Sequence, residues 1–386
     1  MSVSRRKFLL TTTGGMILAA AGSAAVFVST RTPHRALEPW QLAGSAYSEP
    51  RQRALSYALL APNPHNRQPW IADLSVEDTV TLRVDTDRLL KETDPYDRQI
   101  VIGFGCFLEL LVQAAAADGY RIVLNLFPEG ADELSLDKRP IATARFVKDD
   151  AVQADPLFQW ALKRRTNKEP FDTGRPVADS TLAALSQATG AIHSVQMVTS
   201  NDQSMVASFR DVTWRAFQIE YLTPAKLQES IDVMRMGKVE IEANPDGIDV
   251  GGGFLESLML AGVLSRESLA DPSSTGFKQG LEMYKPICDT AMAYVWLKTE
   301  GNNRLQQIAA GRAWVRMNLA ATGLGIGVQP LSQALQEYVE MKELYEKLHQ
   351  TLAEDGGTIQ MLGRLGYGGE ITPSPRWSLQ HKMVNT

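Results

Sequence analysis

Apolar and polar residues repeat along this chain with two periods, one typical of strands and one of helices. Residues 79 to 85 alternate strictly, which indicates a strand with one apolar face. Residues 101 to 118 form a long, mostly apolar run that ends at Gly119, which predicts a buried helix. By the same criteria we expect strands at 121–127, 141–147, 194–199 and 358–365, and helices at 51–60, 155–165, 179–187, 204–221, 306–322 and 335–352.

The predicted strands and helices do not alternate regularly. This mixed order favours an α+β fold over a parallel sheet wound with helices. Residues 31–50 contain several prolines and are expected to form a linker or a wrapping arm. Residues 235–280 are glycine-rich and are expected to be an irregular insertion. Such an insertion is either a lid over a binding site or a surface elaboration without a gating role.

The two most apolar helices indicate an internal repeat. Gly105 precedes Gly119 by the same interval that separates Gly311 from Gly325, and both intervals hold helix formers with an alanine-rich end. The expected division is an N-terminal segment at 1–30, an arm at 31–50, a first unit at 51–150, and a second unit at 151–386 that contains the insertion.

A basic segment in the second half is a candidate anion site. Arg164-Arg165-Thr166-Asn167-Lys168 follows a predicted helix and enters an extended stretch before Pro170. Alternate side chains of an extended stretch share a face, so Arg164, Thr166 and Lys168 could converge on one phosphate through charge-assisted hydrogen bonds. The alternative is a solvated basic patch at a helix C-terminus, which the helix dipole favours.

A proline- and amide-rich loop in the first half has a different character. It reads Ala61-Pro62-Asn63-Pro64-His65-Asn66-Arg67-Gln68-Pro69-Trp70. The prolines stiffen the loop, and its amides offer both donors and acceptors, which suits the edge of a heterocycle. The alternative is a structural turn between a helix and a strand.

Composition and charge exclude several classes of protein. The chain has 386 residues, a net charge of −5 and a pI of about 5.7, which argues against broad nucleic-acid binding. Its two cysteines, Cys106 and Cys288, are too few for a disulfide framework, lack zinc-ligand spacing, and are expected to be buried free thiols. No dinucleotide-binding, nucleophile-elbow, zinc-protease or P-loop motif is present, and no metal site is expected.

The N-terminus resembles a twin-arginine export signal. Ser4-Arg5-Arg6-Lys7-Phe8-Leu9-Leu10 precedes a moderately apolar stretch that reaches about Val28, and Ser23-Ala24-Ala25 offers a small-residue cleavage site. We expect export through the twin-arginine machinery to the periplasm. An uncleaved segment would be long enough to remain as a membrane anchor.

The motifs resemble those of nitroreductase-type flavoproteins. Residues 61–70 resemble their Ala-Pro-Ser-x-x-Asn-x-Gln-Pro-Trp loop, and residues 164–168 resemble their Arg-Arg-Ser-x-Arg motif. Segments 323–330 and 373–376 resemble two later parts of the family pattern. The order along the chain, from about residue 50 to 380, is similar to that of the Acg-type branch, in which two nitroreductase-like units are fused.

This resemblance implies two fused nitroreductase-like units, with antiparallel-rich sheets flanked by helices, that form an internal pseudo-dimer. It also implies FMN between the units, with the chemistry carried by the flavin and not by a catalytic side chain. Carried over by motif, Arg164, Thr166 and Lys168 would hold the phosphate, the ribityl chain and the pyrimidine edge, and Arg376 would add a phosphate contact. The flavin ring would be covered by Pro62, Asn63, Pro64 and Asn66, and its N5 would lie near Leu331, Ser332 and Gln333.

The sequence departs from the family pattern in informative places. Asn63 stands where the family has serine, and Lys168 replaces the second arginine, which keeps the charge and loses the planar fork. The first half has no counterpart of residues 164–168, and residues 188–191 of the second half do not form a polar loop. These losses predict one FMN per chain.

Together these features predict an exported FMN-dependent oxidoreductase that passes hydride or electrons through the flavin N5. The alternative is a flavin-binding or flavin-sequestering protein without turnover. NAD(P)H is scarce outside the cytoplasm, so the electron partner could be a quinol, a redox protein or the substrate itself. An internal pseudo-dimer removes the need for a second copy, so a monomer is expected.

Overall fold

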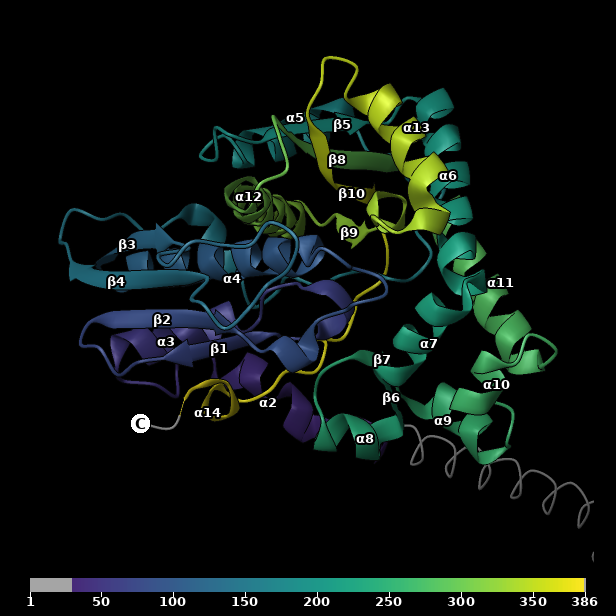
Figure 1. Ribbon diagram of the computed structural model, residues 1–386, viewed down its shortest axis with the longest axis horizontal. Helices are drawn as coiled ribbons and strands as arrows, with labels where there is room; N and C mark the ends of the chain where they lie inside the picture. The colour runs from purple at the N-terminus through teal and green to yellow at the C-terminus, as the bar shows by residue number, and fades with distance from the viewer. Residues whose placement is uncertain (1–29, 385–386) are drawn as a thin grey trace, which may run out of the picture.

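The structure is a computed structural model that describes residues 30–384. The predicted export signal lies outside the described residues. The described chain forms two similar units, one above the other in Figure 1, and a group of helices at one side.

The first unit is an antiparallel sheet covered by helices. Its strand order is β1-β2-β4-β3, and the long helix α4 packs against α3 and β3. Its elements are α3 (Pro50–Ala58), β1 (Trp70–Asp73), β2 (Thr79–Val84), α4 (Arg98–Ala117), β3 (Tyr120–Leu126) and β4 (Ala142–Lys148). Trp70, at the start of β1, packs its ring against Phe104 and Phe107 of α4 and so fixes the sheet to the helix.

The second unit has the same strand order in equivalent positions. Its sheet runs β5-β8-β10-β9 and is also antiparallel, with α12 in the place of α4. Its elements are α5 (Asp179–Ala188), β5 (Gln196–Ser200), β8 (Ala293–Thr299), α12 (Arg304–Gly323), β9 (Gly327–Pro330), α13 (Lys342–Leu352) and β10 (Thr358–Gly366). The α+β fold of two units is therefore confirmed.

The units differ in the connection between their first two strands. Residues 74–78 join β1 to β2 by a short turn, whereas a largely helical insert joins β5 to β8. The insert consists of α6 (Gln203–Leu222), α7 (Pro224–Asp232), β6 (Met234–Met236), α8 (Gly237–Ala243), β7 (Ile248–Val250), α9 (Gly253–Leu260), α10 (Arg266–Ala270) and α11 (Thr275–Asp289). The expectation of an irregular stretch at 235–280 was wrong, because Ser265 and Ser274 cap new helices inside it.

The two central helices cross at a pair of glycines. A Cβ on Gly105 of α4 would lie 2.2 Å from the carbonyl oxygen of Ile308, and one on Gly311 of α12 would lie 1.9 Å from that of Ile102. No side chain fits at either position, so glycine is required for this approach of two backbones. The contact is reciprocal, because Ile102 and Ile308 are separated by the same interval as the two glycines.

The same interval relates the glycines that follow these helices. Gly119 and Gly325 adopt left-handed conformations, with φ of 77° and 69°, and each leads into the next strand, β3 or β9. The spacing noticed in the sequence therefore corresponds to equivalent positions in two copies of one framework. Among the described residues, α4 is the helix long and apolar enough to span a membrane, and most of its apolar stretch is buried between the units.

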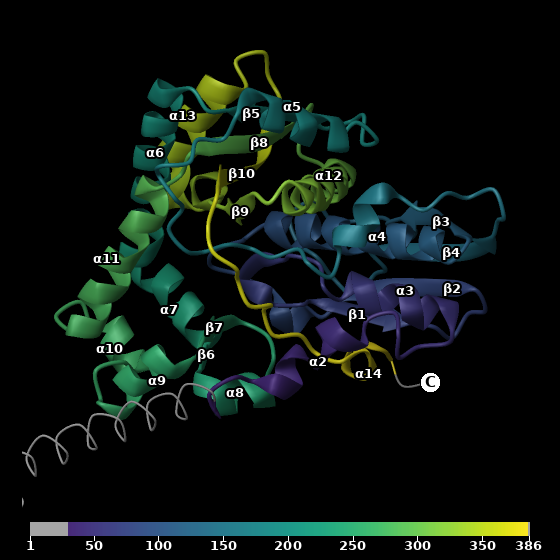
Figure 2. The same cartoon turned by 180° about the vertical axis from the view of Figure 1, so that it is seen from behind.

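Two terminal segments lie across the first unit. The helix α2 (His34–Leu42) falls within the predicted arm, and the chain after β10 runs back past it to α14 (Leu379–Lys382), as Figure 2 shows from behind. The N–H of Arg376 donates to the carbonyl of Ala36, and that of Val384 to the carbonyl of Ala72 in β1. The end of the second half therefore packs on the first unit.

Two predicted helices are shorter than expected, and five of the strands among the described residues were not predicted. Residues 156–160 form a 3-10 helix and then a turn, and residues 333–341 form two 3-10 turns before α13. Arg98 donates a hydrogen bond to the carbonyl of Leu335, which removes the acceptor that a continuous helix would use. The strands β1, β6, β7, β8 and β9 were missed. Both cysteines are buried free thiols, as expected.

Candidate functional site

The proline-rich loop of the first unit has a strained backbone. His65, Asn66 and Gln68 all adopt left-handed conformations, with φ of 44°, 52° and 49°. Such conformations are uncommon outside glycine and persist only where the surroundings fix them. The loop rests on α4 at Gly103, where a Cβ would lie 3.1 Å from Cβ of Asn63. This local strain marks the loop as a candidate functional segment.

The amides of this loop bind the loop itself. Asn63 accepts from the N–H of Gln68 (2.7 Å) and donates to the carbonyl of Ala61 (3.1 Å). Asn66 donates to the carbonyl of Pro375 (3.0 Å) and accepts from Arg376 (2.6 Å). These amides were expected to face a heterocycle. In the structure their hydrogen-bonding groups stabilise the strained turn, which favours the structural reading of this part of the loop.

Arg376 joins the C-terminal segment to the loop. It is buried, and its guanidinium donates to the carbonyls of Leu59 (3.0 Å), Leu60 (3.2 Å) and Ala61 (3.2 Å) as well as to Asn66. Its remaining bond goes to the carbonyl of Pro375. All five of its N–H groups are therefore used within the protein, so Arg376 could attract a nearby anion by its charge alone.

Arg164 lies beside Arg376 and has donors to spare. Its Nη2 also donates to the carbonyl of Leu60 (3.1 Å), whereas its Nε and Nη1 are buried without a partner among the described residues. Burial, with a smaller contribution from the neighbouring charge of Arg165, lowers the pKa of Arg164 to about 10. Unpaired guanidinium donors in the interior are costly, and an anionic ligand would satisfy them.

The charge around these arginines is unbalanced. Arg164, Arg165 and Arg376 form no ion pair with a carboxylate in the described part of the chain. Burial, together with the charges of Arg164 and Arg165, lowers the pKa of Arg376 well below its usual range. Trp40 of α2 lies under two of them, with its ring 4.5 Å from Arg165 and 5.4 Å from Arg376. A cationic cluster of this kind is suited to a phosphate or another anion.

Thr166 and Lys168 continue from this cluster along β9. The N–H of Asn167 donates to the carbonyl of Val328 (2.9 Å), which places the segment beside that strand. Neither the Thr166 nor the Lys168 side chain makes a hydrogen bond or ion pair within residues 30–384. Lys168 is exposed, yet the surrounding protein lowers its pKa, and Asp249 opposes this shift. The Lys168 side chain therefore offers an exposed charged donor on the same segment as the arginine cluster.

His65 and Asp249 lie close enough to Lys168 for its charge to change their pKa values. Burial, together with the charges of Lys168 and Arg67, lowers the pKa of His65 to about 4. Burial raises the pKa of Asp249, whereas Lys168 lowers it. His65 comes from the first unit, Lys168 from the second and Asp249 from the insert, so all three parts of the molecule meet here, and we call the region between these three residues the recess.

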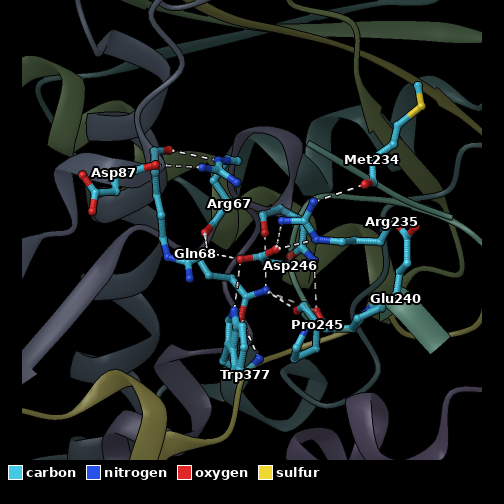
Figure 3. A network of polar contacts seen from close by, with 12 residues as sticks. Arg67, Gln68, Asp87, Met234, Arg235, Glu240, Pro245, Asp246 and Trp377 are labelled. Atoms are coloured by element: carbon cyan, nitrogen blue, oxygen red, sulfur yellow. Dashed lines mark hydrogen bonds and ion pairs between the residues drawn. The ribbon is translucent and has the colours of Figure 1, made fainter. Parts of the chain in front are cut away.

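The insert is fixed to the loop by an ionic network around Asp246 (Figure 3). The buried Asp246 carboxylate pairs with Arg88 of the first unit and with Arg235 of the insert (2.6 Å), and it accepts from the indole of Trp377 (3.1 Å). The N–H of Gly247 donates to the carbonyl of Asn66 (3.1 Å). In the structure the insert is therefore a wall that is bonded to the loop.

Gln68 is the centre of the same network. Its amide donates to the carbonyl of Pro245 (2.7 Å) and accepts from the N–H of Trp377 (2.9 Å), as Figure 3 shows. Lys382 of α14 donates to its backbone carbonyl (2.7 Å), and burial lowers the pKa of Lys382 to about 7. The loop, the insert and the C-terminal segment thus form one rigid junction.

The turn after β9 lies next to the basic segment. Leu331 is buried, and its N–H pairs with the carbonyl of Leu362 in β10. The hydroxyl of Ser332 donates to the same carbonyl (3.0 Å), and the amide of Gln333 reaches the hydroxyl of Tyr284 (3.4 Å). The backbone N–H groups of Ser332 and Gln333 have no partner within residues 30–384 and remain free to donate to a ligand.

The structure adds residues that the sequence did not point to. Asp249 borders the recess, and Asp246 fixes the wall that carries it, but both lie far along the chain from the two motifs. No sequence signal marked either residue. Arg165 was seen as part of the basic run, but its contact with Trp40 depends on where the N-terminal arm folds.

Comparison with known proteins gives a consistent class. No family model matches the chain. A Mycobacterium tuberculosis protein with the provisional name NAD(P)H nitroreductase Rv3131 is 26% identical over 351 residues, which cover 86% of this chain and 90% of that protein. The M. tuberculosis protein with the provisional name NAD(P)H nitroreductase acg is 35% identical over 119 residues, about a third of each chain. Similarity along nearly the full length supports a nitroreductase-like class for this chain.

The similarity of this chain to solved structures is weaker. The FMN-dependent nitroreductase NfnB of Mycobacterium smegmatis, in complex with NADPH, is 16% identical, covers 60% of this chain and 99% of its own, and has a TM-score of 0.38. A nitroreductase of Bacteroides fragilis with bound FMN is 12% identical, covers 58% of this chain and 95% of its own, and has a TM-score of 0.32. Overlap at this level does not by itself establish a shared fold.

Proposed function

We propose that this protein is an FMN-dependent oxidoreductase of the nitroreductase-like class that binds one flavin in the recess between its two units. The observation that carries this proposal is the cationic cluster of Arg164, Arg165 and Arg376, which has no carboxylate partner in the described part of the chain. The nitroreductase names of its relatives, together with the resemblance of residues 61–70 and 164–168 to flavoprotein motifs, point to FMN as the anion.

The residues present fit such a group. The two unpaired buried nitrogens of Arg164 would be satisfied by a phosphate, and Arg376 would contribute charge. Thr166 and Lys168 have free polar groups farther along the same segment. The free N–H groups of Ser332 and Gln333 could donate to the edge of a planar ring. Pro62 and Pro64 would supply apolar cover from the first unit.

A bound FMN would supply the hydride or electron transfer chemistry of its N5. The chain's own residues bind, orient and shield it. Lys168 would stabilise negative charge at the pyrimidine edge, and its effect is strongest where protein excludes water. His65 is neutral at pH 7 because its pKa is about 4, so it would act there as a hydrogen-bonding group and not as a cation.

A single cofactor follows from the asymmetry of the units. Residues 189–195 connect α5 to β5, in the place where the first unit has its proline-rich loop. This connection lacks the amides and prolines of residues 62–69. We therefore infer one site per chain and an internal pseudo-dimer that works as a monomer.

Flavin sequestration without turnover is the second candidate. The network around Asp246 holds the insert against the loop, which would slow the entry and exit of a large ligand. A fixed wall suits long retention of flavin as well as it suits catalysis. Turnover measurements separate the two functions.

Export and the electron partner extend the proposal. Residues 4–10 would direct the folded protein, with its cofactor, through the twin-arginine machinery to the periplasm. NAD(P)H is the first donor to test because of the relatives' names, followed by a quinol and a redox protein.

The first test is the cofactor content of the purified full chain. We expect a yellow protein that releases one FMN per chain on denaturation, identified by chromatography. A colourless protein that does not bind added FMN would reject the proposal. Anaerobic mixing with NAD(P)H or a quinol should bleach the flavin if the protein is an enzyme. A flavin that none of these reduces would favour sequestration.

A matched pair of lysine variants tests the site itself. Lys168→Gln should weaken FMN binding by roughly tenfold or more, since a charged hydrogen bond contributes about 1.5–3 kcal/mol. Lys163→Gln, in the same segment, removes an exposed lysine that lies over the ring of Trp160 and should leave binding unchanged. Equal affinity of both variants would contradict the assignment of Lys168.

A further inference from the structure

The helix α9 has its polar and apolar sides reversed relative to an ordinary surface helix. Its one charged residue, Glu256, is buried, whereas Phe254 and Leu260 are 69% and 76% exposed. Val263, just after the helix, is 41% exposed, and Val239 of the neighbouring α8 is 81% exposed. We call these four residues the apolar corner. A surface helix normally presents its charges to water and buries its large apolar side chains.

Glu256 is buried because it has partners inside. It pairs with Arg31 (3.3 Å) and accepts from the N–H of Lys238 at the start of α8 (3.1 Å). This contact holds α8 and α9 together, so the apolar corner is one surface. Figures 1 and 2 both show the two helices at the edge of the molecule, away from the two four-stranded sheets.

The carboxylates of both helices are neutralised. Besides Glu256, the acids of α8 are Glu240, which pairs with Arg266 (2.6 Å), and Glu242, which pairs with Arg35 (3.8 Å). Paired carboxylates oppose approach to a lipid surface less than free ones would, because the local net charge stays close to zero.

The chain enters the described structure at this corner. The carbonyl of Thr30 accepts from Lys238 of α8 (3.0 Å), and Arg31 pairs with Glu256 of α9. The preceding residues include the apolar stretch from Phe8 to Val28. Val28 precedes Thr30 by two residues, so the apolar stretch joins the described structure at α8 and α9.

We propose that the apolar corner docks on a lipid bilayer, with residues 1–29 as the tether and α9 as the contact surface. A tether and a small apolar patch together bind a membrane far more stably than either alone. Docking would place the insert, which forms one wall of the recess, at the membrane surface. The proposal does not depend on the identity of the ligand in the recess.

An environment-sensitive fluorophore on α9 tests the docking directly. The label is attached to the full chain as Ser257→Cys, and to a control as Ser135→Cys in the loop between β3 and β4. The native thiols should not compete, because burial raises the pKa of Cys106 to about 12 and that of Cys288 to about 11. Vesicles of phosphatidylcholine and phosphatidylglycerol should blue-shift the label at 257 and leave the one at 135 unchanged.

The alternative outcomes contradict the proposal in different ways. No shift at 257, even when the chain sediments with vesicles, would mean that the tether binds alone. A label at 257 already shielded without lipid would point to cover by residues 1–29. A shift that grows with protein concentration in the absence of lipid would point to a second copy of the chain.

A pair of double variants gives a second measurement. Phe254→Ser with Leu260→Ser should weaken vesicle binding on the order of tenfold, since two large apolar side chains no longer leave water. Leu305→Ser with Val339→Ser removes side chains that are also exposed, on other elements, and should have no effect. Equal binding by both variants would overturn the proposal.

Discussion

The two units share one framework and differ in what has been added to it. Both have the strand order first-second-fourth-third around a long helix, and these helices meet at Gly105 and Gly311. The first unit keeps a short turn between its first two strands and a strained polar loop before them. The second unit carries the basic segment and the large insert. The shared parts are those that pack in the core, and the parts that differ border the recess.

The framework of sheets and central helices is symmetric, whereas the candidate site is asymmetric. Positions at the helix crossing cannot change in one unit without affecting the other, since each glycine contacts the backbone of the opposite helix. Loops before and between strands lie at the surface and can change independently. The predictions below test first the shared framework, then the differences, and then the framework again at a finer level.

The largest effect is expected at the helix crossing. Gly105→Val would place side-chain atoms against the carbonyl of Ile308, where even a Cβ would lie at 2.2 Å. We expect a loss of more than about 5 kcal/mol of stability, enough to abolish the folded state. Thermal unfolding and soluble yield would measure it. Gly369→Ala is the control, because nothing lies within 4 Å of its Cβ position.

The next effect concerns the insert. Asp246→Ala leaves Arg88 and Arg235 without their shared partner and should cost about 3 kcal/mol, as expected for a broken, largely buried ion pair. The insert should then become more susceptible to limited proteolysis. Asp232→Ala removes an exposed carboxylate of the same insert and should be nearly neutral. Equal proteolysis of both variants would mean that Asp246 does not hold the wall.

A smaller effect links the two walls of the recess through pH. The pKa of His65 is lowered from 6.5 to about 4 in the folded protein, so the unfolded chain binds a proton that the folded protein does not. Relative to a His65→Gln variant, stability should therefore fall by roughly 2 kcal/mol as pH drops from about 6.5 to about 4. An NMR titration should show the ring pKa near 4, and Lys168→Gln should raise it. If the ring pKa of His65 is the same in the Lys168→Gln variant, the two side chains do not interact across the recess.

The smallest effect is expected at the equivalent glycines after the central helices. Gly325→Ala meets no atom within 4 Å, so its cost of about 1 kcal/mol should come from the left-handed backbone alone. Gly119→Ala should cost a similar amount, because only the flexible end of Lys148 lies close. Chemical denaturation measures both. Costs that differ by several kcal/mol would show that the two positions are not equivalent.

The framework could be predicted from sequence because its signals are local. The interval from Gly105 to Gly119 recurs at Gly311 to Gly325, and the long helices and five of the ten strands among the described residues lie close to their expected bounds. The strand β1 was missed because four residues are too few to show a period. The strand β8 was missed because it is buried on both faces and does not alternate.

The site was less predictable because its residues satisfy one another across long separations. The amides of Asn63 and Asn66 suit a ligand by their chemistry, but the structure uses them to hold the loop. Arg376 was expected to contact a phosphate directly, and its five donors are taken by the protein. Asp249 faces Lys168 only because the insert folds back onto the loop. Such partners depend on tertiary structure, which no local pattern records.

The carbonyl of Leu60 carries a consequence for how the recess is assembled. It belongs to the first unit and accepts from Arg164 and Arg376, which both come from the second half. When such a junction joins separate subunits, dilution breaks it. Here the partners are linked covalently, so their effective concentration is set by the chain and not by its abundance. The recess should therefore remain assembled at the lowest expression level and at any dilution.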